Sequence, residues 1–350
     1  MRILLLPLSI LFRIGVFIKN KLYDWNVIKS VSLGTRVISV GNIAAGGTGK
    51  TPFVEFIARY ILSKGKFAVI LQRGYKRDFD DLKVAEFGFK NENHELNSEN
   101  FGDEGLLMLE NLNNIPDGKG LLIVSDKKSS GAKFADAKFH PDVIIVDDGF
   151  QHRKLDRDLD IVIISESENH MLLPAGNMRE PESAVFRADV IVINNKFKGE
   201  FSVAKTRNKP RVTCFYEFEG LLDLEGKVHE NEGITALAFC GIAEPKSFKT
   251  HLEKQNVKVG EFMVFPDHHS FSNAEIERII ETFKKSGASA IVTTQKDFVR
   301  IKNSELVLSS KGQNIYKELL LNYPLYYAKI KMQISSGQDV LYDKIDELLI

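Results

Sequence analysis

The feature that most constrains this chain is a glycine-rich loop between an apolar β-branched run and a helical pattern. The segment reads Val-Ile-Ser-Val-Gly-Asn-Ile-Ala-Ala-Gly-Gly-Thr-Gly-Lys-Thr-Pro over residues 37–52. Glycines let successive backbone N–H groups turn inward around phosphate oxygens, because no Cβ stands in the way. Such a loop between a strand and a helix N-terminus is typical of nucleotide-binding α/β domains.

The residues of this loop predict how a nucleotide would be held. Lys50 would reach the β- and γ-phosphates, and the Thr51 hydroxyl would bind Mg²⁺. Pro52 fits the first helical turn, where its missing N–H costs little. The usual pattern opens with Gly where this chain has Ala44, so a chance glycine-rich turn is the alternative. The residues expected to line the phosphates are Ala44, Ala45, Gly46, Gly47, Thr48, Gly49, Lys50 and Thr51.

Composition argues against several classes of protein. The 350 residues leave room for two domains, and equal numbers of basic and acidic residues give a formal net charge of zero. Nothing therefore favours a broad nucleic-acid-binding surface. The two cysteines, Cys214 and Cys240, form neither a metal-ligand spacing nor a disulfide framework, so a reducing compartment fits.

The N-terminal segment departs from this average composition. After Arg2 it is almost entirely apolar, but Arg13 interrupts a run that is already short for a membrane span. No small-residue cleavage site follows, which argues against a secretory signal. On a helical wheel Arg2, Ser9, Arg13 and Asn20 share one narrow stripe. We interpret residues 1–30 as a membrane-associated helix at the interface, with its basic residues near the headgroups; a helix buried against the protein's own core is the alternative.

The rest of the chain alternates short apolar runs with helical patterns, which predicts a parallel sheet with helices on both faces. The predicted strands are residues 37–40, 67–71, 121–124, 143–146, 161–164 and 190–193, and the first predicted helix covers residues 52–64. The pattern changes near Pro210. Residues 234–241 and 290–294 resemble strands of a second α/β unit, and residues 211–218 and 325–332 are expected to pair as a ribbon joining the domains.

The predicted fold class is therefore α/β. It comprises a P-loop NTPase-like parallel-sheet domain, a second, smaller α/β domain joined by a two-stranded ribbon, and the N-terminal hydrophobic helix. The expected domains are residues 1–30 for the helix, 31–209 for the P-loop domain, and 210–334 for the linker strands and second domain. The last helix, within residues 335–350, is expected to return to the first domain.

An acidic pair follows one of the predicted strands. Asp147 and Asp148 end the apolar run 143–146. In a nucleotide-binding α/β domain this places them beside Lys50, where they can hold Mg²⁺ directly or through water. Asp147 is the better candidate for the metal.

Two further polar clusters each allow a chemical role and a structural one. Asp103 follows Gly102 just before a leucine-rich helical pattern, and from spacing alone a helix N-cap is favoured. His268 could accept or relay a proton with help from Asp267. Alternatively, the histidines there face solvent or cap the helix that starts near Asn273.

Polar loops after strands are expected at the carboxyl edge of a parallel sheet, where ligands bind. Gln151 and His152 belong to one such loop, and Arg179 belongs to another. Arg179 could neutralise phosphate charge. Its alternative is a surface ion pair with Glu180 or another nearby acid.

Eight short segments, spread over most of the chain, together carry a resemblance. They are Val-Gly-Asn-Ile-Ala-Ala-Gly-Gly-Thr-Gly-Lys-Thr-Pro (40–52), Arg-Gly-Tyr (73–75), Gly-Asp-Glu (102–104), Asp-Asp-Gly-Phe-Gln-His (147–152), Leu-Pro-Ala-Gly-Asn-Met-Arg-Glu (173–180), Phe-Cys-Gly-Ile-Ala (239–243), Phe-Pro-Asp-His (265–268) and Thr-Thr-Gln-Lys-Asp (293–297). In this order they resemble the tetraacyldisaccharide 4′-kinases of lipid A biosynthesis. Gly105, Asn177-Met178 and Gln295 depart from the family's usual pattern, and none of these departures removes a proposed chemical group.

The resemblance implies a Mg-ATP kinase that transfers the γ-phosphate to the 4′-hydroxyl of a tetraacylated glucosamine disaccharide 1-phosphate. It implies two α/β domains with the active site between them, at the cytoplasmic face of the bacterial inner membrane. It also makes Asp103 and His268 the acid–histidine pair next to the acceptor hydroxyl, which reverses the N-cap assignment on the family's support alone. The expected partners are the acylated disaccharide lipid and the membrane surface, with no nucleic acid, and a monomer is expected.

The motifs and the resemblance together define the expected site. Its catalytic groups are Asp103, His268, Lys50 and Arg179; its metal ligands are Thr51, Asp147 and Asp148; and its substrate contacts are Arg73, Gln151 and His152. The expected cofactors are ATP and Mg²⁺.

Two other functions are compatible with a phosphate-binding loop. A membrane-associated switch ATPase would carry a second lysine just before Gly-Gly-x-Gly-Lys-Thr, where this chain has Ala45. Such a protein would hydrolyse ATP without a sugar acceptor, so acceptor dependence separates it from a kinase. A non-catalytic nucleotide-binding scaffold would show no transfer reaction that depends on Lys50.

Overall fold

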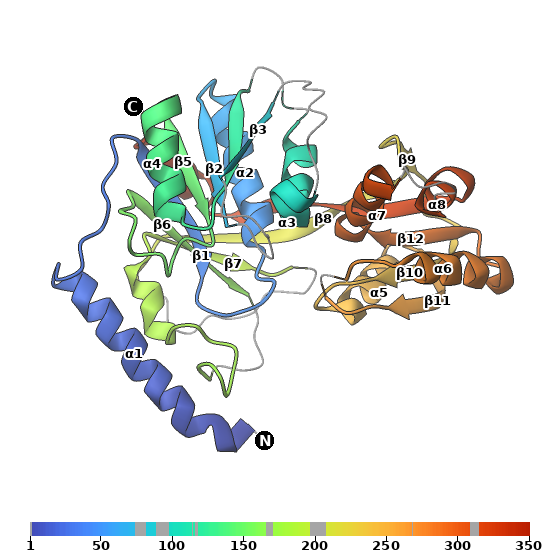
Figure 1. Cartoon of the computed structure of the whole chain (residues 1–350), viewed down its shortest axis with the longest axis horizontal. Coiled ribbons are helices and arrows are strands. Elements are labelled where there is room, and N and C mark those ends of the chain that lie inside the picture. Colours follow the sequence, from blue (N-terminus) through green and yellow to red (C-terminus); the bar gives the residue numbers. More distant parts are fainter. Residues whose placement is uncertain are drawn as a thin grey trace. The chain divides into compact units, whose positions relative to one another are not determined.

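The chain divides into two compact units, which are described separately. The computed structural model describes residues 2–73, 82–88, 98–113, 115, 118–165, 171–196, 208–267, 269–308 and 315–350. The larger unit comprises Met1–Phe215 and Met332–Ile350, and the smaller unit comprises Tyr216–Lys331. Figure 1 labels their helices and strands.

The larger unit is built on a mostly parallel sheet with strand order β8-β7-β6-β1-β5-β2-β4-β3. Every pair is parallel except β3 with β4. The strands are β1 (Arg36–Asn42), β2 (Ala68–Gln72), β3 (Lys83–Phe87), β4 (Gly120–Val124), β5 (Val143–Asp147), β6 (Leu159–Ser165), β7 (Val190–Asn194) and β8 (Arg211–Leu222). The predicted α/β class and six predicted strands are confirmed. Sequence patterning missed β3, because this antiparallel edge strand mixes charged and apolar residues.

Helices cover both faces of this sheet, so its strands are apolar on both sides. The helical elements are η1 (Arg2–Leu5), α1 (Leu6–Asp24), α2 (Lys50–Ser63), α3 (Ser98–Leu112), α4 (Lys128–Phe139), η2 (Glu182–Arg187) and α9 (Gln338–Asp346). On one face Val69 and Ile144 pack with Ala132 and Ala135 of α4. Strand residues that point to the opposite face of the sheet face α2. The side of α2 toward the sheet is buried, with Ile57 fully covered.

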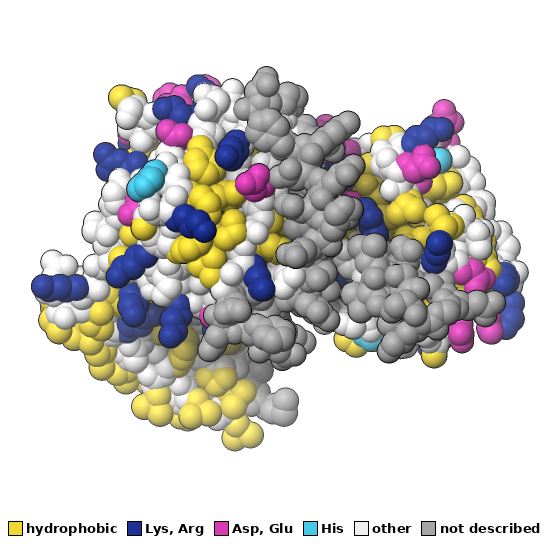
Figure 2. Space-filling model, turned by 45° about the horizontal axis from the view of Figure 1, so that its top comes forward, with side chains coloured by type: hydrophobic (Ala, Val, Ile, Leu, Met, Phe, Trp, Pro, Cys, Tyr) yellow, Lys and Arg dark blue, Asp and Glu magenta, His cyan; other side chains and the backbone are white. Residues whose placement is uncertain are grey.

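The N-terminal helix α1 lies at the outside of the larger unit (Figure 1). Most of its large apolar side chains are exposed, and Ser9 is its buried residue. Figure 2 shows hydrophobic side chains gathered where α1 lies, with Lys and Arg side chains next to them. The alternative of a helix buried against the protein's own core therefore does not describe α1. No helix among the residues described has the length and apolar character that a membrane span requires.

The last helix, α9, packs on α2 within the larger unit. The ring of Tyr342 stacks on that of Tyr60 with 3.6 Å between centroids, and the Tyr60 hydroxyl donates to Asp346 at 2.8 Å. Lys64 Nζ adds an ion pair to the same carboxylate at 3.1 Å. These contacts fix the C-terminal segment to the helix that follows the phosphate loop.

The smaller unit contains the other parallel strands of the same sheet, in the order β11-β10-β12-β13. Its elements are β9 (Val228–His229), β10 (Thr235–Cys240), α5 (Pro245–Lys254), β11 (Lys258–Val264), α6 (Asn273–Ser286), β12 (Ala290–Thr294), α7 (Gln295–Leu308), α8 (Ile315–Asn322) and β13 (Leu325–Ser336). Leu237 and Ile291 face a core shared with α6, α7 and α8, whereas Ala238 and Val292 face α5. The strands predicted at residues 234–241 and 290–294 are confirmed.

The strands β8 and β13 carry the chain between the units and are neighbours in the sheet. Within the larger unit the Ser335 hydroxyl donates to the Thr213 carbonyl at 3.2 Å. Within the smaller unit Lys329 Nζ lies 3.8 Å from the Glu219 carboxylate. The two alternating segments found in the sequence therefore pair with each other, as predicted.

Candidate active site

The phosphate-binding loop runs from the end of β1 to the start of α2, and buried amide side chains hold its shape. Asn42 Nδ2 donates to Thr48 Oγ1 at 2.8 Å, and Asn194 Nδ2 donates to the Thr48 carbonyl at 2.9 Å. Both asparagines are at most 1% exposed, and each is the last residue of its strand. Because a buried amide is costly without a partner, these two hydrogen bonds fix Thr48 firmly.

The end of the loop presents backbone amides at the N-terminus of α2. Gly49 caps this helix in the left-handed region at φ 92°, which glycine adopts without strain. The amides of Lys50 and Thr51 open the helix and have no acceptor within it, which makes an anion site. The amide of Ala45 is committed elsewhere, since it donates to the Asn177 carbonyl at 2.6 Å. Phosphate contacts through backbone amides are therefore expected after Ala45.

Asp147 ends β5 next to the start of α2. Its Oδ2 atom accepts from Thr51 Oγ1 at 3.1 Å and from Gln72 Nε2 at 3.0 Å. Its Oδ1 atom is buried without a hydrogen-bond partner among the described residues. Burial raises the pKa of this carboxyl, and the charge of Glu104 raises it further. The predicted placement of Asp147 beside the loop agrees with this geometry.

Asp148 forms ion pairs with the two candidate phosphate-binding cations, Arg179 and Lys50. Arg179 Nη1 donates to both carboxylate oxygens at 3.0 and 2.9 Å, and Lys50 Nζ lies 3.5 Å from Oδ1. Burial raises the pKa of Asp148, but the charges of Lys50, Arg179 and Lys128 outweigh that effect and hold it below its ordinary value. Arg179 therefore forms an ion pair with an acid of the site and not with Glu180.

Lys128 was not identified from the sequence and is the least exposed cation at this edge, at 5% exposure. Its Nζ donates to the Asp148 carbonyl at 2.6 Å. Asp148 has a positive φ of 54°, an uncommon conformation for a residue with a Cβ. Burial lowers the pKa of Lys128, whereas the charges of Asp148 and Asp147 raise it. The available signal was its position just after β4, at the carboxyl edge of the sheet.

The acids can complete a magnesium site only together with phosphate oxygens. Among the described residues no three His, Cys, Asp or Glu side chains form a group that could hold a metal. Magnesium at nucleotide sites commonly uses one or two carboxylates plus phosphates and waters. The unpartnered Oδ1 of Asp147 and the adjacent Thr51 hydroxyl fit that donor set.

Asp103 lies where α3 changes direction. Gly102 breaks the helix at φ 69°, ψ 166°, so Asp103 opens the part that follows. A Cβ on Gly105 would lie 3.3 Å from Gln72 Oε1, and Gln72 in turn donates to Asp147. This turn of α3 therefore borders the acids at the carboxyl edge of the sheet. The break is compatible with both predicted roles of Asp103, as an N-cap and as a reacting acid.

The three expected substrate contacts have different surroundings. Arg73 is exposed directly after β2. Gln151 Nε2 is used inside the protein, donating to the Asn42 carbonyl at 2.7 Å and to Glu180 at 3.2 Å. Burial, together with the charges of Lys128 and other basic residues, lowers the pKa of His152 to about 4. His152 is therefore neutral at pH 7.

Two of the three segments of the smaller unit that contributed to the resemblance, 239–243 and 293–297, meet at Asp297, which is fully buried. This carboxylate accepts from the Gly241 amide at 2.9 Å, from Thr294 Oγ1 at 2.7 Å and from Arg300 Nη1 at 2.7 Å. Arg300 also donates to the Gly241 carbonyl at 3.1 Å. The residues of these two motifs thus join the end of β10 to the start of α7, so their role is structural.

Pro266 and His269 lie next to this junction, since a Cβ on Gly241 would be 3.1 Å from the Pro266 carbonyl oxygen and 3.2 Å from the His269 Cβ atom. His269 Nε2 is 2.9 Å from Glu275 Oε1, and the His269 ring stacks on Phe265. Glu275 also completes a capping box with Ser272 at the start of α6. Ser272 is therefore the cap of this helix, and His269 has a structural role beside it through its contact with Glu275. His268, the expected catalytic histidine, lies outside the described residues.

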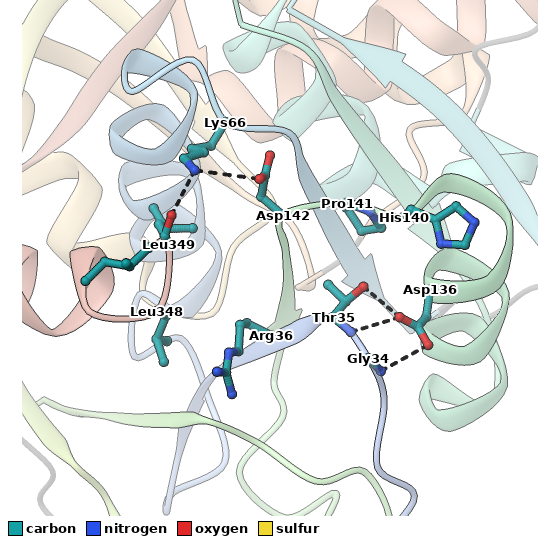
Figure 3. A pocket seen from close by; sticks show the side chains of 11 residues that line it. Gly34, Thr35, Arg36, Lys66, Asp136, His140, Pro141, Asp142, Leu348 and Leu349 are labelled. Carbon is teal, nitrogen blue, oxygen red and sulfur yellow. Dashed lines mark hydrogen bonds and ion pairs between the residues drawn. The ribbon is translucent and has the colours of Figure 1, made fainter.

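A surface pocket of about 390 Å³ in the larger unit is remote from the phosphate loop of the same unit. It lies where β1 and β5 begin, whereas the phosphate loop follows the end of β1. Figure 3 shows Lys66 bridging Asp142 and the Leu349 carbonyl, with Asp136 bonded to Thr35 and Gly34. These groups satisfy one another and tie down the C-terminal segment.

The fold and the glycine-rich loop of residues 44–51 define an α/β protein of the P-loop class, with a candidate phosphate site at the carboxyl edge of its sheet. A family model described as tetraacyldisaccharide-1-P 4′-kinase matches residues 1–349. The chain belongs to this family.

Individual relatives agree over the full length. The tetraacyldisaccharide 4′-kinase of Koribacter versatilis is 36% identical, with 98% of each chain covered. That of Chlorobium chlorochromatii is 32% identical and covers 100% of this chain and 94% of the relative. The crystal structure of LpxK from Aquifex aeolicus in complex with ATP superposes with a TM-score of 0.76 at 31% identity, covering 100% of this chain and 99% of that one.

The buried lysine generates a prediction about nucleotide binding. Lys128→Met keeps the side-chain length but removes the hydrogen bond that holds the Asp148 carbonyl. We expect MgATP to bind roughly tenfold more weakly, since hydrogen bonds from charged groups are among the stronger ones. The unfolding temperature should stay near that of the wild type, because the apolar side chain avoids the cost of burying a charge. Calorimetric titration and thermal unfolding measure the two effects.

The matched control is Lys127→Met, which changes the exposed neighbouring lysine. It should leave MgATP affinity unchanged. Equal affinity of the Lys128→Met variant and the wild type would show that Lys128 does not shape the site.

Proposed function

We propose that this protein is a kinase that transfers the γ-phosphate of ATP to the 4′-hydroxyl of a tetraacyldisaccharide 1-phosphate in lipid A biosynthesis. The observation that carries the proposal is that Thr51 contacts Asp147 and Lys50 contacts Asp148 at the phosphate loop. The chain belongs to this kinase family over residues 1–349. The ATP bound by the Aquifex aeolicus relative supports the choice of nucleotide.

The charged groups at the loop suit phosphoryl transfer. This reaction needs in-line placement of the reactants and neutralisation of charge on the transferring group. Asp148 keeps Lys50 and Arg179 together at the loop, so both cations are in place to turn to phosphate oxygens. Thr51 and Asp147 would hold Mg²⁺, which would supply positive charge that offsets the charge of the phosphates.

Asp103 is proposed to accept the proton of the sugar hydroxyl, with His268 as its partner. The support for Asp103 is its position at the break in α3, on the turn that borders Gln72 and Asp147. The support for His268 is the family motif alone. Arg73, which is exposed at the end of β2, is proposed to contact the acceptor. The same role is proposed for Gln151 and His152 on the family motif alone, since Gln151 Nε2 already donates within the protein.

The N-terminal helix is proposed to bring the enzyme to the cytoplasmic face of the bacterial inner membrane, where its lipid acceptor lies. The exposed side chains that support this role are Leu4, Leu8, Ile10, Leu11, Ile14, Phe17 and Ile18. A helix with such an apolar outer face binds in the plane of an interface. A lipid with four acyl chains does not leave a bilayer readily, so the enzyme gains by binding the same surface.

The first test uses γ-labelled ATP with the acylated disaccharide 1-phosphate and Asp103→Asn as the variant. The wild type should label the lipid only when both substrates are present. The variant should turn over at least roughly a hundredfold more slowly, within the range of general-base contributions, while ATP affinity is retained. Glu110→Gln, two turns further along the same helix, is the matched control and should keep normal turnover.

ATP hydrolysis that is equally fast without any lipid acceptor would contradict the kinase proposal and favour a switch ATPase. Near-normal turnover of the Asp103→Asn variant would instead remove only Asp103 from the mechanism.

The second test concerns the membrane surface. Leu11→Asp introduces a charge on the outer face of α1, where Leu11 is 64% exposed. We expect less protein to sediment with phospholipid vesicles and lower activity on bilayer-embedded substrate, because burying a charged side chain in the interface is unfavourable. Leu321→Asp, at a leucine 59% exposed on α8, is the control. Equal sedimentation of both variants and the wild type would contradict the role of α1.

A further inference from the structure

The N-terminal helix contacts the larger unit through polar side chains on its inner side. Ser9 Oγ donates to the Leu172 carbonyl at 3.0 Å and accepts from the Ala175 amide at the same distance. Lys19 Nζ donates to the Gln151 carbonyl at 3.2 Å. Ser9 and Asn20 belong to the polar stripe found on the helical wheel, and these two residues of the stripe contact the protein.

Asn20 contacts the most enclosed carboxylate of this region. Glu180 is 2% exposed, and Arg187 holds it with two hydrogen bonds at 2.8 and 3.0 Å. Asn20 Nδ2 donates to Oε2 at 2.8 Å, and Gln151 Nε2 donates to Oε1 at 3.2 Å. A buried carboxylate is stable only when donors satisfy its oxygens. The loss of one donor therefore strengthens the interaction of the carboxylate with the remaining donors.

The same groups support the entry to the phosphate loop. Gln151 Nε2 donates to the Asn42 carbonyl at 2.7 Å as well as to Glu180. The Glu180 amide donates to the Ile43 carbonyl at 3.3 Å. Asn42 in turn holds Thr48 through its side chain. A chain of direct contacts therefore leads from α1 to the loop that faces the phosphates, all within the larger unit.

We propose that Asn20 and Glu180 are positioning residues that couple the docking of α1 to the conformation of the phosphate loop. The N-terminal helix then takes part in nucleotide binding in addition to binding a membrane. Without the hydrogen bond from Asn20, Glu180 would attract Gln151 Nε2 more strongly. The same Nε2 atom donates to the Asn42 carbonyl, so that second hydrogen bond would weaken. The inference rests on the proposed function, because it concerns the affinity for ATP.

The experiment titrates MgATP into full-length protein in detergent micelles, with no lipid acceptor present. Asn20→Ala should weaken ATP binding by roughly three- to tenfold, in the range of mutations that act through coupled networks. Asn20→Asp keeps the shape but replaces the donor by a carboxylate facing Glu180, so it should weaken binding at least as much. Sedimentation of both variants with vesicles should match the wild type, because their outer apolar face is intact.

Phe17→Ala is the matched control on the outer side of the same helix, where Phe17 is 61% exposed. It should reduce sedimentation with vesicles and leave ATP affinity unchanged. A purely structural or membrane-binding role for Asn20 would not produce this opposite pair of results.

The outcomes separate the two proposals. Wild-type ATP affinity in both Asn20 variants, with circular dichroism showing folded protein, would overturn the coupling and leave the proposed kinase function intact. Absence of ATP binding by the wild type would overturn the proposed function itself. If Asn20→Ala and Glu180→Gln weaken ATP binding additively when combined, the two residues do not act through one network and the coupling is again contradicted.

Discussion

The contact between Thr51 and Asp147 is the interaction on which the rest of the site depends. It joins the first turn of α2 to the end of β5 at 3.1 Å, and Gln72 fixes the same carboxylate oxygen from β2. Because three elements converge on one buried carboxylate, the amides at the start of α2 have a defined position relative to the acids. The other oxygen of Asp147, Oδ1, accepts no hydrogen bond from the described residues, and it is the atom proposed to face the metal.

The charged groups around Asp148 form the second part of the site. Three cations lie against one acid, from α2, α4 and the loop that carries Arg179. Two of them, Lys50 and Arg179, can turn to phosphate oxygens, whereas the third is buried and holds the backbone. In the proposed mechanism, cations that are already assembled would bind the anionic phosphate, which would reduce the reorganisation needed for phosphoryl transfer.

Much of this was predictable from sequence, because apolar periodicity fixes the strands and glycine fixes the loop. The positions of Asp147 and Asp148 followed from their place after an apolar strand. What sequence patterning missed were buried polar residues, namely Gln72, Lys128 and Asn194, whose partners lie far away in the chain. The pattern gave one unused clue, since Gln72 and Asn194 each end an apolar strand. The helical wheel grouped Ser9 and Asn20 on one stripe of α1 but did not show that they contact the protein, because periodicity does not say what covers a face of a helix.

The central claim is that the loop around Lys50 binds the phosphates of ATP, and calorimetric titration tests it most directly. MgATP should bind the wild type with a single site, and Lys50→Ala should abolish or greatly weaken that binding while the protein remains folded. Failure of the wild type to bind MgATP, or equal affinity in the Lys50→Ala variant, would contradict the account.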